Sequence, residues 1–526
     1  MKRLNPLEHK ITPRGRVFYN WPGGHCNDPL VFKDPAQLGV EPYDIIIVGA
    51  GVVGSALAYE LSQYDLRVLL LDKKYDVGEG TSKGNSALIH VGFDEEPGSL
   101  EAELVTQASR VWPELAGKLK VPLRETGALL AALDNEQAAQ LEKLYRKSLT
   151  NGVDDVEIVS ADHLHRLEPN LSPHVLCGLL VPRESVVDPF TVSIAYCEVA
   201  VANGVDVVFG VGVLSVEDTM KTIMKLVDES GHRFPTRVVA NVAGLGSRKL
   251  ADSYRGEHFD INPRRGQFLI YDRNTSHLIE RILLPVPSMK TKGKLIAPTI
   301  FGNLLTGPTA EDLPLDDPGV TATTLDGLTE VRQAALQMCP RLSEHLPIAS
   351  YAGARCNCAQ GSFRVAVGDG HPGIVTVTGI RSTGLTASPM LAKYLVERIG
   401  DAGLISLAHD KQAVDSRPES AWPGWWKHPW DDPLRITAKP SYGRMVCFCE
   451  LISEGEILDA LDSPLHPCSL DAVKRRTRAQ TGRCQGFNCQ VRIGELIAGR
   501  YGLELAHVTK CGPGTELLPE WSKETT

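Results

Sequence analysis

The feature that most constrains the fold of this chain is a strand, a glycine turn, a helix and a second strand close to the N-terminus. Residues 43–60 read as a strand, the turn Gly49-Ala50-Gly51-Val52-Val53-Gly54 and a helix, and the next strand, residues 67–71, ends at Asp72. An isolated GxGxxG is commonly only a flexible turn. Here both strands, the helix and the acidic residue keep the spacing of a complete dinucleotide-binding unit.

Each glycine of the turn has its own task. Gly49 permits the tight turn, Gly51 lets the backbone approach a pyrophosphate, and Gly54 lets the helix pack closely on the strand. Asp72 stands where a carboxylate accepts hydrogen bonds from an adenosine ribose. The helix N-terminus adds amide donors and a favourable dipole. The motif alone does not distinguish NAD from FAD.

The rest of the chain divides into several regions, since 526 residues predict roughly two to four compact units. Apolar strands alternate with helices over residues 43–407, which is typical of an α/β fold whose parallel sheet is covered on both faces. Residues 1–42 show no clear period, and we expect an irregular extension there. Residues 408–443 are predicted to be a linker, 444–503 a small domain and 504–526 a tail. Four tryptophans predict that the linker packs across a domain surface: Trp422, Trp425, Trp426 and Trp430.

The composition excludes several classes of protein. A chain that is 43% hydrophobic and 23% charged is globular and not disordered. The net charge of -9 is spread along the chain, so nothing indicates a nucleic-acid surface. The richest apolar run, residues 45–61, is interrupted by glycines and a serine, and no stretch reaches the roughly 20 residues of a membrane helix. Without a secretory signal pattern in residues 1–42, we expect a cytoplasmic protein with at most peripheral membrane association.

A second signature lies in the C-terminal cysteines. Six of the 12 cysteines fall between Cys447 and Cys511, and four of them form a CxC and a CxxxxC pair. In a reducing compartment such clustering favours metal or cluster ligation over disulfides. Four thiolates in two pairs can hold either zinc or a two-iron cluster, and the spacing leaves both open.

A basic stretch lies between the two cysteine pairs. It contains Lys474, Arg475, Arg476 and Arg478. These cations would offset the negative charge of a thiolate-bound cluster, or they would form a solvated basic helix face.

Five segments downstream of the glycine turn carry a family resemblance. They are residues 81–90 (TSKGNSALIH), 241–244 (NVAG), 302–309 (GNLLTGPT), 351–355 (YAGAR) and 377–386 (VTGIRSTGLT). With them the chain resembles, over about residues 43–403, the flavoproteins of the D-amino-acid oxidase and glycerol-3-phosphate dehydrogenase superfamily. The resemblance implies an FAD-binding Rossmann-like domain with an interleaved α+β substrate domain.

The resemblance also implies which residues hold the FAD. In relatives the N-terminus of the helix after residues 377–386 faces the flavin pyrimidine ring, and its amides stabilise the negative charge that a reduced flavin gathers there. The expected FAD contacts are Gly49, Gly51, Gly54, Asp72, Thr81, Ser82, Asn85, Ser86, Ala243, Gly244, Gly379, Ile380, Gly384, Leu385 and Thr386.

A flavin dehydrogenase removes a hydride from a carbon that bears an OH or NH, so its pocket needs an anchor for the substrate anion and a proton acceptor. Arg355 matches the family's substrate arginine and can bind a carboxylate or a phosphate, although a structural ion pair is the alternative. Arg265 and Arg381 are further candidate anchors. His90 is the candidate base because relatives bear a histidine in this loop, although a lone histidine is often structural. Phe301 stands where relatives often carry a histidine, so a base is missing there.

The C-terminal region resembles the bacterioferritin-associated ferredoxin domain. The matching stretches are Arg475-Arg476-Thr477-Arg478 and Thr481-Gly482-Arg483-Cys484-Gln485-Gly486, within residues 444–503. The resemblance implies a small helical domain with a [2Fe-2S] cluster, and the same fusion occurs in the large subunit of anaerobic glycerol-3-phosphate dehydrogenase. The expected ligands are Cys447, Cys449, Cys484 and Cys489. Cys468 and Cys511 fall outside the pattern.

Together the two signatures predict an FAD-dependent dehydrogenase that oxidises a small anionic secondary alcohol similar to glycerol 3-phosphate. Electrons would pass from FAD to the cluster and on to a partner protein or a quinone pathway. A 2-hydroxyacid or amino-acid (imino-acid) dehydrogenase is the alternative enzyme, favoured by the likeness of residues 302–309 and 379–386 to the 2-hydroxyglutarate oxidase branch. A non-catalytic electron-transfer subunit of a hetero-oligomer is the alternative from another class, and the intact glycine turn and Arg355 argue against it.

Overall fold

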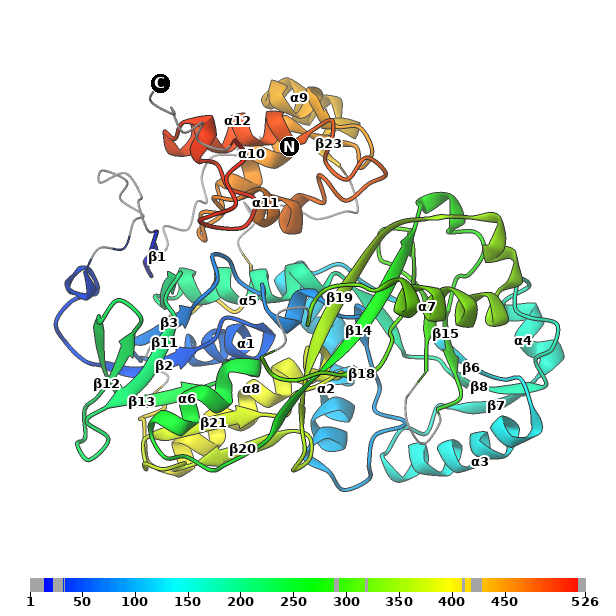
Figure 1. Cartoon of the computed structure of the whole chain (residues 1–526), viewed down its shortest axis with the longest axis horizontal. Helices are drawn as coiled ribbons and strands as arrows, with labels where there is room; N and C mark the ends of the chain where they lie inside the picture. Colours follow the sequence, from blue (N-terminus) through cyan, green and yellow to red (C-terminus); the bar gives the residue numbers. More distant parts are fainter. Residues whose placement is uncertain are drawn as a thin grey trace, which may run out of the picture.

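The structure is a computed structural model that describes residues 14–21, 32, 34–287, 293–316, 320–408, 412–417 and 428–518. Two large sheets form the body of the molecule, and a small helical unit made by the C-terminal residues lies above the first sheet (Figure 1). The mixed α/β fold with a helical C-terminal domain is confirmed.

The first sheet carries the glycine turn. Its strand order is β1-β10-β3-β2-β13-β12-β11, with β21 beside β13 and β20 beside β21. The pairings from β10 through β3, β2 and β13 to β21 are parallel. The strands are β1 (Val17–Tyr19), β2 (Tyr43–Val48), β3 (Val68–Asp72), β10 (Asp206–Phe209), β11 (Val213–Glu217), β12 (Met224–Asp228), β13 (Arg233–Asn241), β20 (Arg364–Val367) and β21 (Ile374–Thr378).

Helices cover both faces of this sheet. Helices α1 (Val52–Leu61), α5 (Pro189–Ala202) and α8 (Gly384–Asp401) contribute to the core on one face, and α6 (Ser247–Ser253) contributes to the core on the other. Ile45 and Ile47 pack with Leu57 of α1, whereas Ile46 packs in the opposite core with Leu250 of α6. Because side chains alternate along a strand, a strand buried on both faces must be apolar throughout.

The N-terminal segment differs from the expectation of an irregular extension. Its strand β1 pairs in parallel with β10, and Val17 and Tyr19 are buried. The Tyr19 hydroxyl donates to the carbonyl of Leu465 in the C-terminal unit at 2.7 Å. Three residues are too short to show a period in the sequence, and only the exposed edge of β10 gives them a pairing partner.

The second sheet follows the order β18-β14-β17-β16-β15-β6-β8-β7, with β19 paired to β14. In the long antiparallel pair of β14 and β19, Gly266 lies opposite Gly353 and Arg264 opposite Arg355. The strands are β6 (Ala128–Ala132), β7 (Glu157–Ser160), β8 (Cys177–Val181), β14 (Ile261–Tyr271), β15 (Ile282–Pro285), β16 (Leu295–Pro298), β17 (Leu304–Gly307), β18 (Glu311–Asp312) and β19 (Pro347–Cys358). The accompanying helices are α3 (Asn135–Thr150), α4 (Ala161–Leu167) and α7 (Leu325–Met338).

A three-stranded sheet completes the body of the molecule. Strand β9 (Ser185–Val187) pairs with both β4 (Leu88–Ile89) and β5 (Leu123–Glu125). Helix α2 (Leu100–Leu119) is the longest described helix, with 20 residues, and it carries charges at Glu101 and Glu103. Within the ranges given above, no helix is both long and apolar enough to cross a membrane.

The C-terminal unit has its own apolar core. Its elements are α9 (Pro433–Ala438), β22 (Met445–Cys447), β23 (Ile452–Ser453), α10 (Glu454–Leu461), α11 (Leu470–Thr477) and α12 (Gln490–Tyr501). Residues 428–443, expected in the linker, pack on this unit, and Trp430 donates to the Leu451 carbonyl at 2.7 Å. Val508 of the predicted tail is buried in its core. Three of the predicted linker tryptophans lie outside the described residues: Trp422, Trp425 and Trp426.

Candidate active site

The glycine turn lies between β2 and α1, and neighbouring backbone leaves no room for a Cβ at Gly49 or Gly54. Gly49 has a φ of 110°, and a Cβ there would lie 2.7 Å from the Val242 carbonyl oxygen. A Cβ on Gly54 would lie 1.8 Å from the Gly49 carbonyl oxygen. Gly51 begins α1 without a side-chain cap. The crowding explains the tight turn and the close helix packing, while the approach of Gly51 to a pyrophosphate stays a prediction.

Asp72 closes the same turn from the end of β3. Its carboxylate accepts the backbone N–H of Ala50 at 2.6 Å and that of Lys74 at 2.7 Å. Burial raises the pKa of Asp72, and the two amides oppose this rise. Each carboxylate oxygen keeps a second lone pair, so a ribose hydroxyl can still bind, and this role stays a prediction.

The ends of β13 and β21 bring two further predicted segments to the same edge. Because β13 pairs in parallel with β2, and β21 pairs in parallel with β13, their carboxyl ends lie at the same edge of the sheet as the glycine turn. Ala243 and Gly244 follow β13, and Gly379 and Ile380 follow β21. Gly244 and Gly379 have φ values of 57° and 68°, which glycine adopts at little cost.

The flavin-side loop, residues 81–90, is held by contacts within itself and to the turn. Ser82 Oγ accepts the N–H of Val52, the first residue of α1, at 2.9 Å. Asn85 donates to the Ser82 carbonyl at 2.5 Å and accepts the Ala87 N–H at 2.7 Å. The loop therefore has a defined shape beside the nucleotide turn. The other predicted contacts in it are Thr81 and Ser86.

The same loop lies directly against β19. Thr81 Oγ1 donates to the Ala354 carbonyl at 2.8 Å. A Cβ on Gly353 would lie 1.8 Å from the Gly84 carbonyl oxygen, so both positions need glycine for this approach. The contact places the flavin-side loop two residues from Arg355, which joins two segments that the sequence predicted separately.

Helix α8 begins at Gly384 beside the loop. Thr383 precedes it, and its hydroxyl donates to Glu101 at 2.6 Å instead of capping the helix. The first amides of a helix lack carbonyl partners within it, so this start suits a negatively charged ring edge. Thr386 Oγ1 accepts the His90 N–H at 3.0 Å, which ties the helix start to the loop. Leu385, in the first turn of α8, is buried.

His90 ends the loop beside a buried carboxylate that the sequence analysis missed. Its Nδ1 lies 3.0 Å from Glu184 Oε2, and Glu184 Oε1 accepts the Val91 N–H at 2.9 Å. The Glu184 side chain is fully buried, and that of His90 is 19% exposed. A buried carboxylate on one ring nitrogen orients the imidazole and stabilises its protonated form. No local motif could have identified Glu184, because 94 positions separate the pair and only the pairing of β4 with β9 joins them.

Arg355 projects from β19 without a carboxylate partner. Its Nη2 donates to the Thr309 carbonyl at 2.7 Å, and no described carboxylate oxygen lies within 4.0 Å of its guanidinium. Burial, followed by the nearby Arg264, lowers the pKa of Arg355 to about 10, so the side chain is charged at neutral pH. A partly buried cation whose partners are carbonyl oxygens is suited to bind an anion.

The other two candidate anchors are already paired. Arg265 forms an ion pair with Glu311 at 2.7 Å, and Arg381 forms one with Glu101 at 3.2 Å. These partners neutralise the charge that a substrate anion would need. Among the three arginines, the geometry therefore favours Arg355 as the anchor.

The four predicted cluster ligands meet in the C-terminal unit. The thiols of Cys447 and Cys489 are hydrogen-bonded, as are those of Cys449 and Cys484. The bond from Cys489 lowers the pKa of Cys447, and the backbone amide of Asn488 lowers that of Cys484. The partner thiols show the opposite direction, with the pKa of Cys489 and of Cys449 raised. In the part of the chain that the structure describes, no group of three or more His, Cys, Asp or Glu side chains is arranged around a single ion. Two thiol pairs match the requirement of a two-iron cluster, in which each iron takes two thiolates.

The basic stretch of α11 does not have the predicted role. Arg475 and Arg476 are buried and form ion pairs with Asp76 of the first domain, at 2.7 and 2.8 Å. Asp76 and Glu79 together neutralise their charge, so they are neither a solvated face nor a counter-charge kept for the cluster. Arg478 lies 3.8 Å above the ring of Phe301, where the sequence analysis found a histidine missing.

Comparison with known proteins agrees with this geometry. Residues 44–398 match the family described as FAD dependent oxidoreductase. The chain belongs to this family. Residues 445–499 of the FAD-dependent oxidoreductase match the BFD-like [2Fe-2S] binding domain. Both predicted cofactors, FAD and a [2Fe-2S] cluster, are thereby confirmed, while their assignment to individual residues stays a prediction.

Several named proteins are similar to this FAD-dependent oxidoreductase. The glycerol 3-phosphate dehydrogenase of Caloramator mitchellensis is 33% identical over 477 residues, which cover 90% of this chain and 98% of that protein. The L-2-hydroxyglutarate dehydrogenase of Caenorhabditis briggsae is 30% identical over 52% of this chain and 66% of that protein. The dithionite-reduced L-alpha-glycerophosphate oxidase of Mycoplasma pneumoniae with FAD bound has a TM-score of 0.67 at 27% identity, covering 72% of this chain and 98% of that structure.

Proposed function

We propose that this FAD-dependent oxidoreductase oxidises sn-glycerol 3-phosphate or a closely similar anionic secondary alcohol, and that its electrons leave through the [2Fe-2S] cluster. The observation that carries the proposal is Arg355, which is partly buried beside the flavin-side loop and has no carboxylate partner among the described residues. Its fork can bind two oxygens of a phosphate at once. The likeness to the Caloramator enzyme over 90% of the chain supports this choice of substrate.

Two side chains have defined tasks in the proposed reaction. Arg355 binds the substrate anion and thereby sets the position of the neighbouring alcohol carbon. His90 takes the proton of the alcohol, and Glu184 stabilises the imidazolium that forms. FAD supplies the acceptor for the hydride that leaves the same carbon. Loss of one proton and one hydride converts the alcohol into a ketone.

The electron count requires a partner outside the active site. Each substrate releases two electrons, and a [2Fe-2S] cluster takes one at a time. Passage of both electrons through the cluster would therefore require an external acceptor, a protein or a quinone pathway, to take up one electron twice per substrate. Exposed apolar side chains next to the cysteines, Phe448 and Phe487, support contact with a protein at this point.

A 2-hydroxyacid dehydrogenase is the second candidate. The L-2-hydroxyglutarate dehydrogenase of Caenorhabditis briggsae supports it. The Arg355 guanidinium suits a carboxylate as well as a phosphate, so the anchor alone does not decide between the substrates.

Anaerobic absorbance spectra of the purified holoenzyme test the proposal. We expect sn-glycerol 3-phosphate to bleach the flavin bands and then reduce the cluster absorption. Bleaching by L-2-hydroxyglutarate alone would establish the second candidate. Bleaching by neither compound would contradict both and favour a non-catalytic electron-transfer subunit.

A further inference from the structure

We propose that Asp76, together with Arg475 and Arg476, positions the cluster domain on the FAD-binding domain for electron transfer between the two cofactor sites. The proposal rests on the proposed function in one respect, the direction of electron flow. It assigns a task to a basic stretch that the cysteine motif left unexplained.

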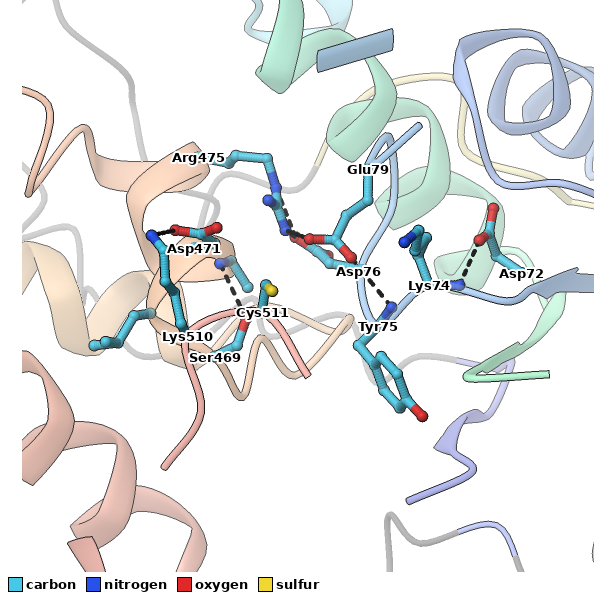
Figure 2. A network of polar contacts seen from close by, with 12 residues as sticks. Asp72, Lys74, Tyr75, Asp76, Glu79, Ser469, Asp471, Arg475, Lys510 and Cys511 are labelled. Atoms are coloured by element: carbon cyan, nitrogen blue, oxygen red, sulfur yellow. Dashed lines mark hydrogen bonds and ion pairs between the residues drawn. The ribbon is translucent and has the colours of Figure 1, made fainter. Parts of the chain in front are cut away.

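The three side chains form a buried ion cluster between the domains. Arg476 binds both carboxylate oxygens of Asp76, at 2.8 and 2.9 Å. Arg475 binds Asp76 at 2.7 Å and Glu79 at 2.9 Å. Figure 2 shows Arg475 extending from α11 toward Asp76 and Glu79 in the segment that follows Asp72. The Asp76 side chain is fully buried, so this bidentate arrangement fixes the orientation of α11.

On one side, the ion cluster holds the loop that joins two predicted FAD contacts. Asp76 lies between Asp72, at the end of β3, and Thr81, in the flavin-side loop. The N–H of Gly78 donates to the Ala50 carbonyl of the glycine turn at 2.8 Å. Asp76 is therefore two residues from backbone that is hydrogen-bonded to the nucleotide turn.

On the other side, the same arginines precede the cluster ligands by a few residues. The backbone amide of Gln480 is hydrogen-bonded to the thiols of Cys447 and Cys489. Arg476 and Gln480 are four positions apart, so their Cα atoms are separated by at most about 14 Å. One short segment thus touches the FAD-binding loop at one end and the cluster ligands at the other.

Other contacts hold the domain in place without Asp76. Arg273, which lies two residues after the end of β14, pairs with Glu450, next to Cys449, at 2.6 Å. Ser463 donates to Glu198 of α5 at 2.6 Å, in addition to the Tyr19 contact described above. The loss of Asp76 is thus expected to change the placement of α11 while the cluster domain stays attached.

Asp76→Asn removes the charge with little change of size. The two buried guanidiniums then lose the counter-ion that they share, while Glu79 remains paired with Arg475. We expect α11 to shift so that the uncompensated charge is solvated. Glu217→Gln is the matched control, because Glu217 forms an exposed pair with Arg233 far from either cofactor site in the fold.

The test uses the anaerobic holoenzyme and delivers electrons by light. A photochemical donor reduces the flavin without substrate, and flavin and cluster absorption are followed separately. In Asp76→Asn we expect transfer to the cluster to slow at least about tenfold, because small misplacements have large effects on rates between fixed groups. Bleaching by sn-glycerol 3-phosphate should change less than about twofold, since Asp76 does not contact the anchor or the base. Hydrogen–deuterium exchange should become faster in residues 470–480 of the variant.

The outcomes separate this proposal from the proposed substrate. If light-driven transfer slows in Asp76→Asn but glycerol 3-phosphate bleaches neither enzyme, the substrate is wrong and the positioning role stands. An unchanged transfer rate, or an equal slowing of transfer and of substrate bleaching, would overturn the positioning role. If Asp76→Asn does not fold, Arg475→Lys keeps the charge and loses the fork, and an unchanged transfer rate in that variant would equally overturn it.

Discussion

The buried carboxylate of Glu184 lies 3.0 Å from Nδ1 of His90, because Glu184 directly precedes β9 and His90 directly follows β4, its partner in the small sheet. The backbone of His90 is bonded at the same time to Thr386 in the first turn of α8. The imidazole is therefore fixed with respect to both the flavin-side loop and the helix start. The sequence already made His90 the candidate base, and these contacts give its imidazole a defined orientation.

Glu184→Gln tests that relationship. Glutamine keeps the shape but removes the charge that stabilises protonated His90, so kcat for glycerol 3-phosphate should fall by about 100-fold. Anaerobic stopped-flow bleaching of the flavin measures the effect at saturating substrate. The exposed Glu217→Gln should bleach at the unmodified rate. An unchanged rate in Glu184→Gln would remove His90 from the mechanism.

Arg355→Lys should weaken the binding of the substrate anion. A lysine keeps the charge but loses the second parallel hydrogen bond, so kcat/KM should fall by about 100-fold, mainly through KM. Steady-state kinetics with an artificial electron acceptor measure it. Arg265→Lys is the comparison, and its kcat/KM should change only a few-fold because Glu311 already occupies that guanidinium. A larger loss of kcat/KM in Arg265→Lys than in Arg355→Lys would make Arg265, and not Arg355, the anchor for the substrate anion.

Gly54→Ala should abolish FAD retention. The added Cβ would lie 1.8 Å from the Gly49 carbonyl oxygen, so helix α1 or the turn must move. The ratio of flavin to protein absorbance after gel filtration measures the loss. Gly80→Ala is a suitable control, because nothing lies within 4 Å of a Cβ at that position. Full FAD content in Gly54→Ala would show that the turn adapts.

Cys447→Ser should remove the cluster and leave the flavin. Purified enzyme should fall from about two irons per chain to near none, because each iron of the cluster needs two thiolates. Iron and sulfide analysis together with visible circular dichroism measure this. Cys468→Ser should keep its iron, since Cys468 lies outside the ligand pattern. Zinc in place of iron in the unmodified enzyme would contradict the cluster.

Stability should depend on pH through Glu168. Burial raises the pKa of this carboxyl from 4.5 to about 7, even though the N–H groups of Glu280 and Arg281 donate to it. The folded state then holds a proton that the unfolded state has released, so this contribution to stability is complete below about pH 4.5 and is lost as pH rises to about 7. Glu168→Gln has no such proton to lose.

Thermal unfolding at pH 5 and pH 8 measures the difference between the two proteins. From pH 5 to pH 8 the unmodified chain should lose about 3 kcal/mol of unfolding free energy relative to Glu168→Gln. Glu344→Gln, at an exposed position, should follow the unmodified protein at both pH values. Parallel behaviour of Glu168→Gln and the unmodified protein would show that Glu168 is ionised throughout.

The sequence by itself determined the family, both cofactors and the order of the fold. A glycine turn between two strands needs residues with no Cβ at fixed spacings, and a cluster needs thiols at fixed spacings. Both requirements act over a few neighbouring residues. These spacings can therefore be recognised in the sequence without knowledge of the tertiary structure, at Gly49, Gly54, Cys447 and Cys489.

Only the tertiary structure decided which charges remain for chemistry. The sequence does not distinguish the three candidate arginines, Arg265, Arg355 and Arg381. In the fold, Glu311 from β18 pairs with Arg265 and Glu101 from α2 pairs with Arg381, so that Arg355 alone of the three has no described carboxylate partner. Glu184 beside His90 and Asp76 beneath Arg476 likewise depend on which distant segments meet. The electrostatic character of a charged group is set by its neighbours within a few ångströms, and the chain path that supplies those neighbours is a property of the folded molecule.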